Sequence, residues 1–121
     1  MPTCLVVDDN LSNRMVAQYI MEDLTFQVDV VESADEASAA LVLQSYDVLL
    51  LDWMMPHMDG IDFLSRIRQN PKHENLKVVM CSAKEGEANV NAALAAGANA
   101  YLAKPITFDA AEKVMKDLGI L

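Results

Sequence analysis

The sequence predicts an α/β fold, in which a mostly parallel five-stranded sheet is covered by helices on both faces. Two observations lead to this prediction. Short apolar runs alternate regularly with stretches of helical spacing, and the connections between them are only a few residues long. With 121 residues, 53% of them hydrophobic, the chain is long enough for one domain with a normal core. We therefore expect a single domain over residues 1–121, with no output domain after it.

Five runs have strand character because they are short and rich in branched apolar residues. They are residues 4–7, 27–31, 47–51, 76–81 and 100–103. The run at 47–51 is the most apolar, as expected for a central strand that is buried on both faces.

The first helix is predicted over residues 11–24, directly after the first strand. Its spacing places five apolar residues on one face. Arg14 is expected on a solvated face, and the alternatives are that it pairs with nearby acids or contacts a partner. The apolar residues are Leu11, Met15, Tyr19, Ile20 and Leu24.

Four more helices follow. Ser33 and Glu36 form a capping box that opens the second helix, whose inward side is small. Asp59 caps the third helix, which ends near Asn70. The last two helices are predicted at 85–96, stopped by Gly97, and at 108–118. The small inward residues of the second helix are Ala34, Ala37, Ala40 and Leu41.

These elements predict a doubly wound sheet with the flavodoxin-like strand order 2-1-3-4-5. Right-handed crossovers leave few arrangements of five parallel strands, and this order is the leading one. A ligand in such a fold binds beyond the carboxyl ends of the strands, beside the first strand.

Charged residues stand at the ends of three of these runs. Asp8 and Asp9 close the first run, Asp52 closes the third, and Lys104 follows the fifth. In the predicted sheet they meet at one edge, where three carboxylates suit Mg²⁺, with Mn²⁺ as an alternative ion. Without metal the carboxylates repel one another, so at least one pKa should rise. Lys104, together with the hydroxyl of Ser82, could then bind phosphoryl oxygens.

The composition of the chain limits which partners and which cellular location we expect. Eighteen acidic and nine basic residues give a formal charge of −9, which argues against binding a nucleic-acid backbone. Cys4 and Cys81 lie in apolar runs on strands that are not adjacent in the predicted order, so we expect reduced thiols and a cytoplasmic location. No apolar run is long enough to span a membrane.

Four segments together resemble the receiver domain of response regulators, the CheY-like family of two-component signalling, over essentially the whole chain. They are VVDDN at 6–10, LLDWMMPHMDG at 50–60, SA at 82–83 and AGANAYLAKP at 96–105.

The resemblance implies a role for each matching residue. Asp52 would accept a phosphoryl group, and Asp8, Asp9, Asp52 and the Met54 carbonyl would hold Mg²⁺. Ser82, the Ala83 amide and Lys104 would bind the phosphoryl oxygens, and the Lys104–Pro105 bond would be cis. Ser82 and Tyr101 would be the switch that remodels the surface of the fourth helix, fifth strand and fifth helix. The residues with implied roles are Asp8, Asp9, Asp52, Met54, Ser82, Ala83, Tyr101, Lys104 and Pro105.

The resemblance also implies the partners. The phosphoryl donor would be a histidine kinase or a histidine phosphotransfer protein, and the target would be another protein, with neither nucleic acid nor membrane involved. The chain would catalyse only its own phosphorylation and dephosphorylation. Its role as a motor effector, a phosphorelay intermediate or a phosphate sink stays open.

Two other functions fit the sequence less well. A phosphatase of the haloacid-dehalogenase type has its two aspartates two residues apart, whereas Asp8 and Asp9 are adjacent. A flavin site needs a Ser/Thr/Gly-rich loop where this acidic pair stands.

Two neighbours of Asp52 carry further hypotheses. Met54 is apolar where some receivers have a polar residue. One hypothesis is that it hinders the hydrolytic water, and the equally weighted alternative is that it simply covers the loop. Trp53 is the only tryptophan, and its fluorescence should report Mg²⁺ and phosphorylation. The alternative is a partly exposed aromatic residue with no role in the mechanism.

Overall fold

The computed structural model describes residues 1–84 and 86–121. Within them the sheet strands are β1 (Thr3–Val7), β2 (Gln27–Val31), β3 (Val48–Asp52), β4 (Lys77–Ser82) and β5 (Ala100–Ala103). The α-helices are α1 (Leu11–Asp23), α2 (Ala34–Leu43), α3 (Gly60–Gln69), α4 (Glu87–Ala95) and α5 (Phe108–Asp117). A short 3₁₀ helix, η1 (Pro71–His73), joins α3 to β4.

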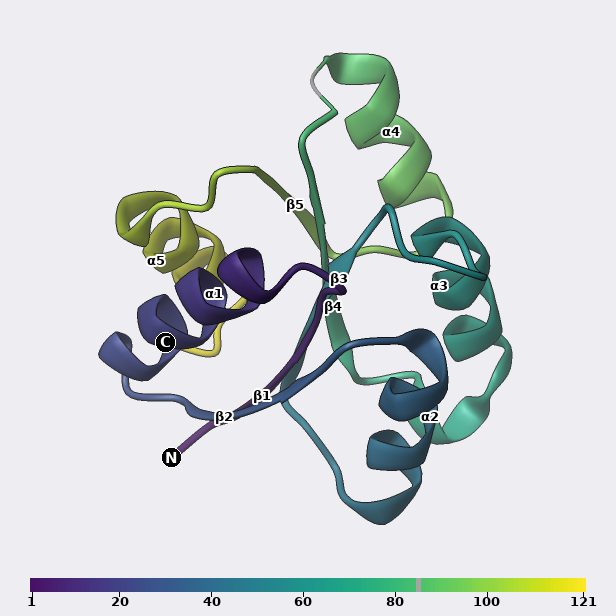
Figure 1. Ribbon diagram of the computed structural model, residues 1–121, viewed down its shortest axis with the longest axis horizontal. Coiled ribbons are helices and arrows are strands. Elements are labelled where there is room, and N and C mark those ends of the chain that lie inside the picture. The colour runs from purple at the N-terminus through teal and green to yellow at the C-terminus, as the bar shows by residue number, and fades with distance from the viewer. Residues whose placement is uncertain (85) are drawn as a thin grey trace.

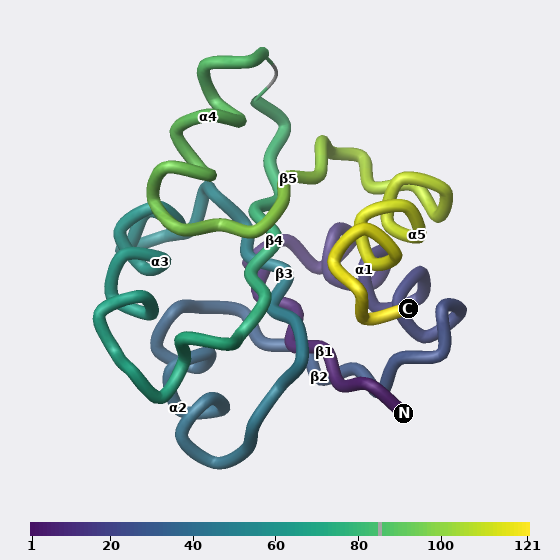
Figure 2. Tube along the Cα trace, turned by 180° about the vertical axis from the view of Figure 1, so that it is seen from behind, coloured from purple at the N-terminus to yellow at the C-terminus, as the bar shows by residue number. Residues whose placement is uncertain are grey.

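The five strands form one parallel sheet in the order β2-β1-β3-β4-β5, which confirms the predicted fold class. Helices α1 and α5 cover one face of the sheet, and α2, α3 and α4 cover the other (Figure 1). The view from behind gives the same two layers (Figure 2). In this order β1 and β3 are neighbours, so the residues that follow them meet at one edge.

Alternate residues of the central strands face opposite layers. Leu5, Leu49 and Val78 belong to the core under α2, α3 and α4. Val6 and Leu50 belong to the core under α1 and α5. Strand β3 is buried along its whole length, as its apolar sequence predicted.

The helix signals in the sequence are mostly confirmed. The side chains of Asn10, Ser33, Asp59 and Thr107 cap α1, α2, α3 and α5 by accepting a backbone N–H. Gly97 follows α4 with φ +114°, a conformation that a side chain would disfavour. The predicted start of α4 at position 85 lies outside the described residues.

The predicted apolar face of α1 is confirmed for Ile20 and Leu24 and is wrong for its other three residues. Leu11, Met15 and Tyr19 are exposed, with 62%, 60% and 74% of their surfaces accessible. The buried stripe follows i, i+3, i+4, i+7 spacing and consists of Ala17, Ile20, Met21 and Leu24. Apolar residues of α1 occur on more than one side of the helix, so the sequence spacing alone is compatible with two different buried faces. Packing against the sheet and α5 selects the one with the small Ala17.

Cys4 and Cys81 are buried, unpaired thiols on strands that are separated by β3, as predicted. Among the described residues, no helix has both the length and the apolar character needed to cross a bilayer.

Candidate functional site

Three carboxylates gather at the carboxyl edge of the sheet. Asp8, Asp9 and Asp52 each offer an oxygen, and these atoms all lie within 4.8 Å of one another. Asp8 and Asp52 are buried, whereas Asp9 is exposed. Hard oxygen ligands at this spacing, with one open side for water, fit a divalent cation such as Mg²⁺.

A cavity of about 250 Å³ opens beside the carboxylates. It is lined by six of the residues predicted to belong to the site and by two asparagines from the start of α1. Its lining is Asp8, Asp9, Asn10, Asn13, Asp52, Met54, Ala83 and Lys104.

In the loop between β1 and α1, two side chains accept hydrogen bonds from nearby backbone N–H groups. The Asn10 N–H donates to Asp8 Oδ1 at 2.9 Å, and the Asn13 N–H donates to Asn10 Oδ1 at 3.0 Å. The second bond is the N-cap of α1. The start of the helix therefore fixes where the two aspartates lie.

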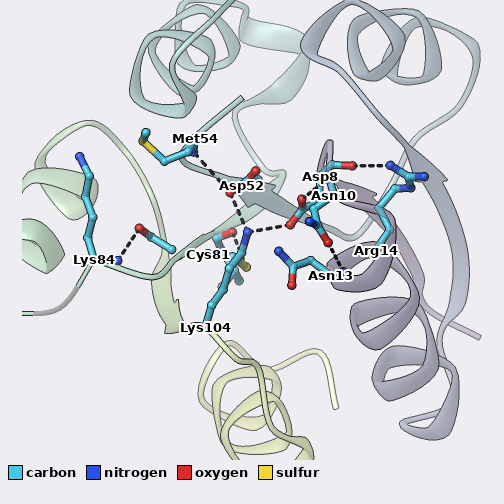
Figure 3. A network of polar contacts seen from close by, with 11 residues as sticks. Asp8, Asn10, Asn13, Arg14, Asp52, Met54, Cys81, Lys84 and Lys104 are labelled. Carbon is cyan, nitrogen blue, oxygen red and sulfur yellow. Dashed lines mark hydrogen bonds and ion pairs between the residues drawn. The ribbon is translucent and has the colours of Figure 1, made fainter. Parts of the chain in front are cut away.

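Arg14 is buried beneath this loop, which overturns the prediction of a solvated face. Its Nη1 donates to the Asp8 carbonyl at 3.0 Å (Figure 3). Its Nη2 lies 3.2 Å from Oε1 of Glu32, which stands just past the end of β2. The prediction failed because the partner, Glu32, is distant in sequence and reaches Arg14 only through the pairing of β1 with β2.

Lys104 lies between two of the carboxylates. Its Nζ is 2.7 Å from Asp8 Oδ2 and 2.8 Å from Asp52 Oδ1 (Figure 3). The Lys104 N–H donates to the Ser82 carbonyl at 2.8 Å, and the bond to Pro105 is cis. The ammonium therefore bridges the two buried carboxylates of the cluster, where its positive charge is favourable.

The charges at this edge perturb one another. Burial raises the pKa of Asp52 to about 6; Lys104 acts in the opposite direction and Asp8 adds to the rise. A rise was predicted from repulsion, but desolvation is its largest cause. Burial lowers the pKa of Lys104, and the two carboxylates more than offset this, so that its pKa is raised.

Ser82 and Tyr101 are joined through the backbone of Lys84. The Lys84 N–H donates to Ser82 Oγ at 2.9 Å, and the Tyr101 hydroxyl donates to the Lys84 carbonyl at 2.6 Å. The Lys84 ammonium lies 4.5 Å from the centre of the Trp53 ring, and Trp53 meets Tyr101 edge to face at 6.3 Å. Trp53 is only 6% exposed, so it is not the partly exposed aromatic residue of the alternative interpretation. These contacts connect the residue after Asp52 with both predicted switch residues.

The turn that follows Asp52 depends on a glycine. The Gly60 N–H donates to the Trp53 carbonyl at 2.7 Å, and a Cβ on Gly60 would lie 2.6 Å from the Asp52 carbonyl oxygen. The Met54 N–H donates to Asp52 Oδ1 at 3.3 Å, while the Met54 side chain is 63% exposed at the cavity. In the sequence, Gly60 appeared only as part of the motif at 50–60. The reason that a glycine is needed there, the closeness of the Asp52 carbonyl, is visible only in the structure.

Comparison with protein families decides the relationship. The model of the response regulator receiver domain matches residues 4–116. The chain belongs to this family. It is thus a receiver domain of two-component signalling, and its acidic pocket is of the kind in which receivers bind Mg²⁺.

Curated relatives agree with this assignment. The phosphate regulon transcriptional regulatory protein PhoB of Rhizobium meliloti is 36% identical over 107 residues, which cover 88% of this chain and 47% of PhoB. A CheY homolog from Campylobacter jejuni is 32% identical over 117 residues, covering 94% of this chain and 89% of that protein. The receiver thus spans about half the length of PhoB and most of the CheY homolog.

Solved structures have the same fold. A response regulator from Chloroflexus aurantiacus superposes with a TM-score of 0.90 at 29% identity, covering 98% of this chain and 99% of that one. A receiver domain from Francisella gives 0.88, also at 29% identity, covering 98% and 96%.

Proposed function

We propose that this receiver takes a phosphoryl group on Asp52 from a phosphohistidine of a histidine kinase or phosphotransfer protein, and that it signals by binding another protein. The observation that carries the proposal is the group around Asp52 at the open edge of the sheet. Two further carboxylates have oxygens within 4.8 Å of its own, and the Lys104 ammonium contacts Asp52 and Asp8.

In the proposed transfer, an oxygen of Asp52 attacks phosphorus while the bond from phosphorus to the donor imidazole nitrogen breaks. The product is an aspartyl phosphate and a free imidazole, which takes up a proton. Asp8, Asp9, Asp52 and the Met54 carbonyl would hold Mg²⁺, or Mn²⁺ in its place. The ion supplies positive charge for the phosphoryl oxygens.

Lys104 has to change partners during this reaction. Its ammonium now neutralises Asp8 and Asp52, and we infer that it moves to a phosphoryl oxygen once Asp52 is modified. Ala83 lines the cavity, so its N–H is a suitable second donor, and the Ser82 hydroxyl is the third. The phosphoryl group adds about −1.5 to −2 charge at a site that already has three carboxylates.

The proposed switch passes through Lys84. When Ser82 turns toward the phosphoryl group, its oxygen leaves the Lys84 N–H, and the loop that also holds the Tyr101 hydroxyl is released. Tyr101 can then rotate inward, which remodels the surface of α4, β5 and α5 for a protein target. No DNA or membrane contact is part of this proposal, and the net charge of −9 supports a protein partner.

The chain would not be a turnover enzyme, because it would act only on its own aspartyl phosphate. The buried, unpaired Cys4 and Cys81 are compatible with a reducing compartment, so we propose a cytoplasmic location. The phosphatase alternative is not favoured, since the receiver model covers residues 4–116. Motor effector, relay intermediate and phosphate sink remain alternatives within the proposal.

Labelling by a small phosphodonor tests the proposal. With acetyl phosphate or phosphoramidate and Mg²⁺, mass spectrometry should find one phosphoryl group on the wild type and none on Asp52→Asn. Asp59→Asn is the matched control, because Asp59 caps α3 outside the carboxylate cluster and should leave labelling intact. Labelled Asp52→Asn would show that the acceptor is misassigned, and multiple turnover of phosphate esters would favour the phosphatase.

A further inference from the structure

Positive charge is concentrated in one short segment of this acidic protein. Four of the nine Lys and Arg residues lie between positions 66 and 77, beside a single acid, Glu74. The other 109 residues therefore contain five basic side chains against seventeen acidic ones. The segment covers the end of α3, all of η1 and the start of β4.

A groove lies beside this segment, at the amino ends of β3 and β4 and thus at the opposite edge of the sheet from Asp52. It consists of two adjoining hollows of about 280 and 160 Å³ that share Leu41 and His73. The smaller hollow lies between α2 and α3, which lie side by side on the same face of the sheet in both views (Figures 1 and 2). The larger hollow is lined by Leu41, residues 44–47 before β3, η1, residues 75–77 and Ile120. We call this hollow the α2–α3 groove.

The floor of the α2–α3 groove is apolar and its rim is basic. Leu41, Phe63 and Ile67 form part of the floor, and Val42 stands above them with 71% of its surface exposed. The basic rim consists of Arg66, Lys72 and Lys77.

The rim charges are not neutralised by the protein itself. Among the ion pairs found in residues 1–84 and 86–121, none involves Arg66, Lys72 or Lys77. The carboxylate of Asp47, the one acid in the lining, accepts two hydrogen bonds from Thr3. An occupant with negative charge would therefore meet cations that no carboxylate of the described residues pairs with.

We propose that the α2–α3 groove docks an acidic amphipathic helix of a partner protein. Apolar side chains of that helix would cover Val42 and the floor, and its carboxylates would pair with the rim. A helix fits better than an extended peptide because the hollow with the apolar floor lies between two helices, α2 and α3, and offers no strand edge to extend. The proposal goes beyond the proposed function and does not depend on phosphorylation of Asp52.

A synthetic peptide provides the test. The probe is a fluorescein-labelled helical peptide with Leu at i, i+3, i+4 and i+7 and Glu on the flanks of this stripe; the control peptide has Lys in place of each Glu. Fluorescence anisotropy should show binding of the acidic peptide only. The amide shifts that it causes in ¹⁵N spectra should centre on α2, α3 and η1.

Two matched double variants distinguish binding at the groove from a general effect of the protein's net charge. Arg66→Glu with Lys72→Glu should weaken binding by about tenfold or more. Lys113→Glu with Lys116→Glu makes the same charge change on α5 and should leave binding within about twofold. Val42→Ser removes an exposed contact and should weaken binding while the fold stays intact.

Three results would overturn the proposal. They are equal binding of the Lys-containing peptide, shifts that centre on another surface, and self-association of the protein through the groove, which would make a second copy the occupant. Labelling of Asp52 can fail or succeed independently of all three, so the two proposals are tested separately.

Discussion

Asp52 illustrates how the environment of one residue changes its chemistry. Its pKa is raised from 3.8 to about 6, chiefly because its carboxylate is buried, so the folded, metal-free protein keeps this proton to a higher pH than the unfolded chain does. Between these two pH values the folded state binds more protons than the unfolded state. The stabilising contribution is therefore complete below the lower value and is lost as pH rises through about 6.

The corresponding prediction concerns unfolding in EDTA. Between pH 3.8 and about 6, the titration of Asp52 should lower the free energy of unfolding as pH rises. The slope should be at most about 1.4 kcal/mol per pH unit. Asp52→Asn should remove that slope, as measured by urea unfolding at several pH values. Equal slopes for the two proteins would mean that Lys104 keeps Asp52 ionised.

Arg14 should act on the metal site through the Asp8 backbone. Arg14→Gln loses the bond to the Asp8 carbonyl and the pair with Glu32, so the loop that holds Asp8 and Asp9 is less fixed. We expect Mg²⁺ affinity to fall by about tenfold, measured by calorimetric titration. Glu32→Gln keeps the carbonyl bond and should have a smaller effect. Affinity unchanged in Arg14→Gln would show that the N-cap of α1 positions the loop without help.

Met54 should control the lifetime of the phosphorylated state. Its exposed side chain lines the cavity beside Asp52 and can shield the phosphoryl group from water. Met54→Asn should shorten the half-life severalfold, followed by release of inorganic phosphate. Met54→Leu keeps an apolar cover and should preserve it. A lifetime in Met54→Asn equal to or longer than that of the wild type would refute the shielding role.

At the level of elements, Arg68 joins parts of the fold that are distant in sequence. Its guanidinium donates to the carbonyls of Gly97, His73 and Leu76 and to the side chain of Asn99. Asn99 also accepts the N–H of Val78. These bonds connect α3 and η1 with the start of β4 and the turn before β5.

Arg68→Lys keeps the charge but lacks the planar fork that makes these bonds. We expect it to lower the free energy of unfolding by about 2 kcal/mol, because partly buried carbonyls lose their donors. Arg66→Lys, two residues earlier on the exposed side of α3, should change it by less than about 0.5 kcal/mol. Chemical unfolding of both variants provides the measurement, and equal stabilities would contradict the role of Arg68.

At the level of the whole molecule, Mg²⁺ binding and folding stability should be linked. Three neighbouring carboxylates repel one another in the metal-free state, and an ion that binds only the folded protein stabilises it. Asp9→Asn removes one of these charges. It should raise the melting temperature in EDTA by a few degrees and reduce the further rise that Mg²⁺ produces. A lower melting temperature in EDTA would mean that hydrogen bonding at Asp9 outweighs repulsion.

Much of the fold can be predicted from this sequence because its signals are local. The alternation of apolar runs and helical spacing predicts five strands and five helices, and the caps at Ser33 and Asp59 mark where helices begin. The run before Asp52 is apolar throughout, which predicts a central strand. The strand order follows from the few arrangements that short right-handed crossovers permit.

The site was predictable to a similar extent, since Asp8, Asp9, Asp52 and Lys104 each follow a strand and parallel strands end at the same edge. Other features could not be predicted, because they depend on contacts between distant residues. Which face of α1 is buried depends on α5 and the sheet, and Arg14 meets Glu32 only where β1 pairs with β2.

The sequence by itself determined the fold class, the edge of the sheet at which the charged residues gather, and their chemical type. Tertiary structure decided how those charges share their partners: Lys104 lies between Asp8 and Asp52, and the Lys84 backbone links Ser82 with Tyr101. It also created the α2–α3 groove, whose apolar floor and basic rim come from separate segments. Local patterns set the elements, whereas packing sets which of their side chains meet.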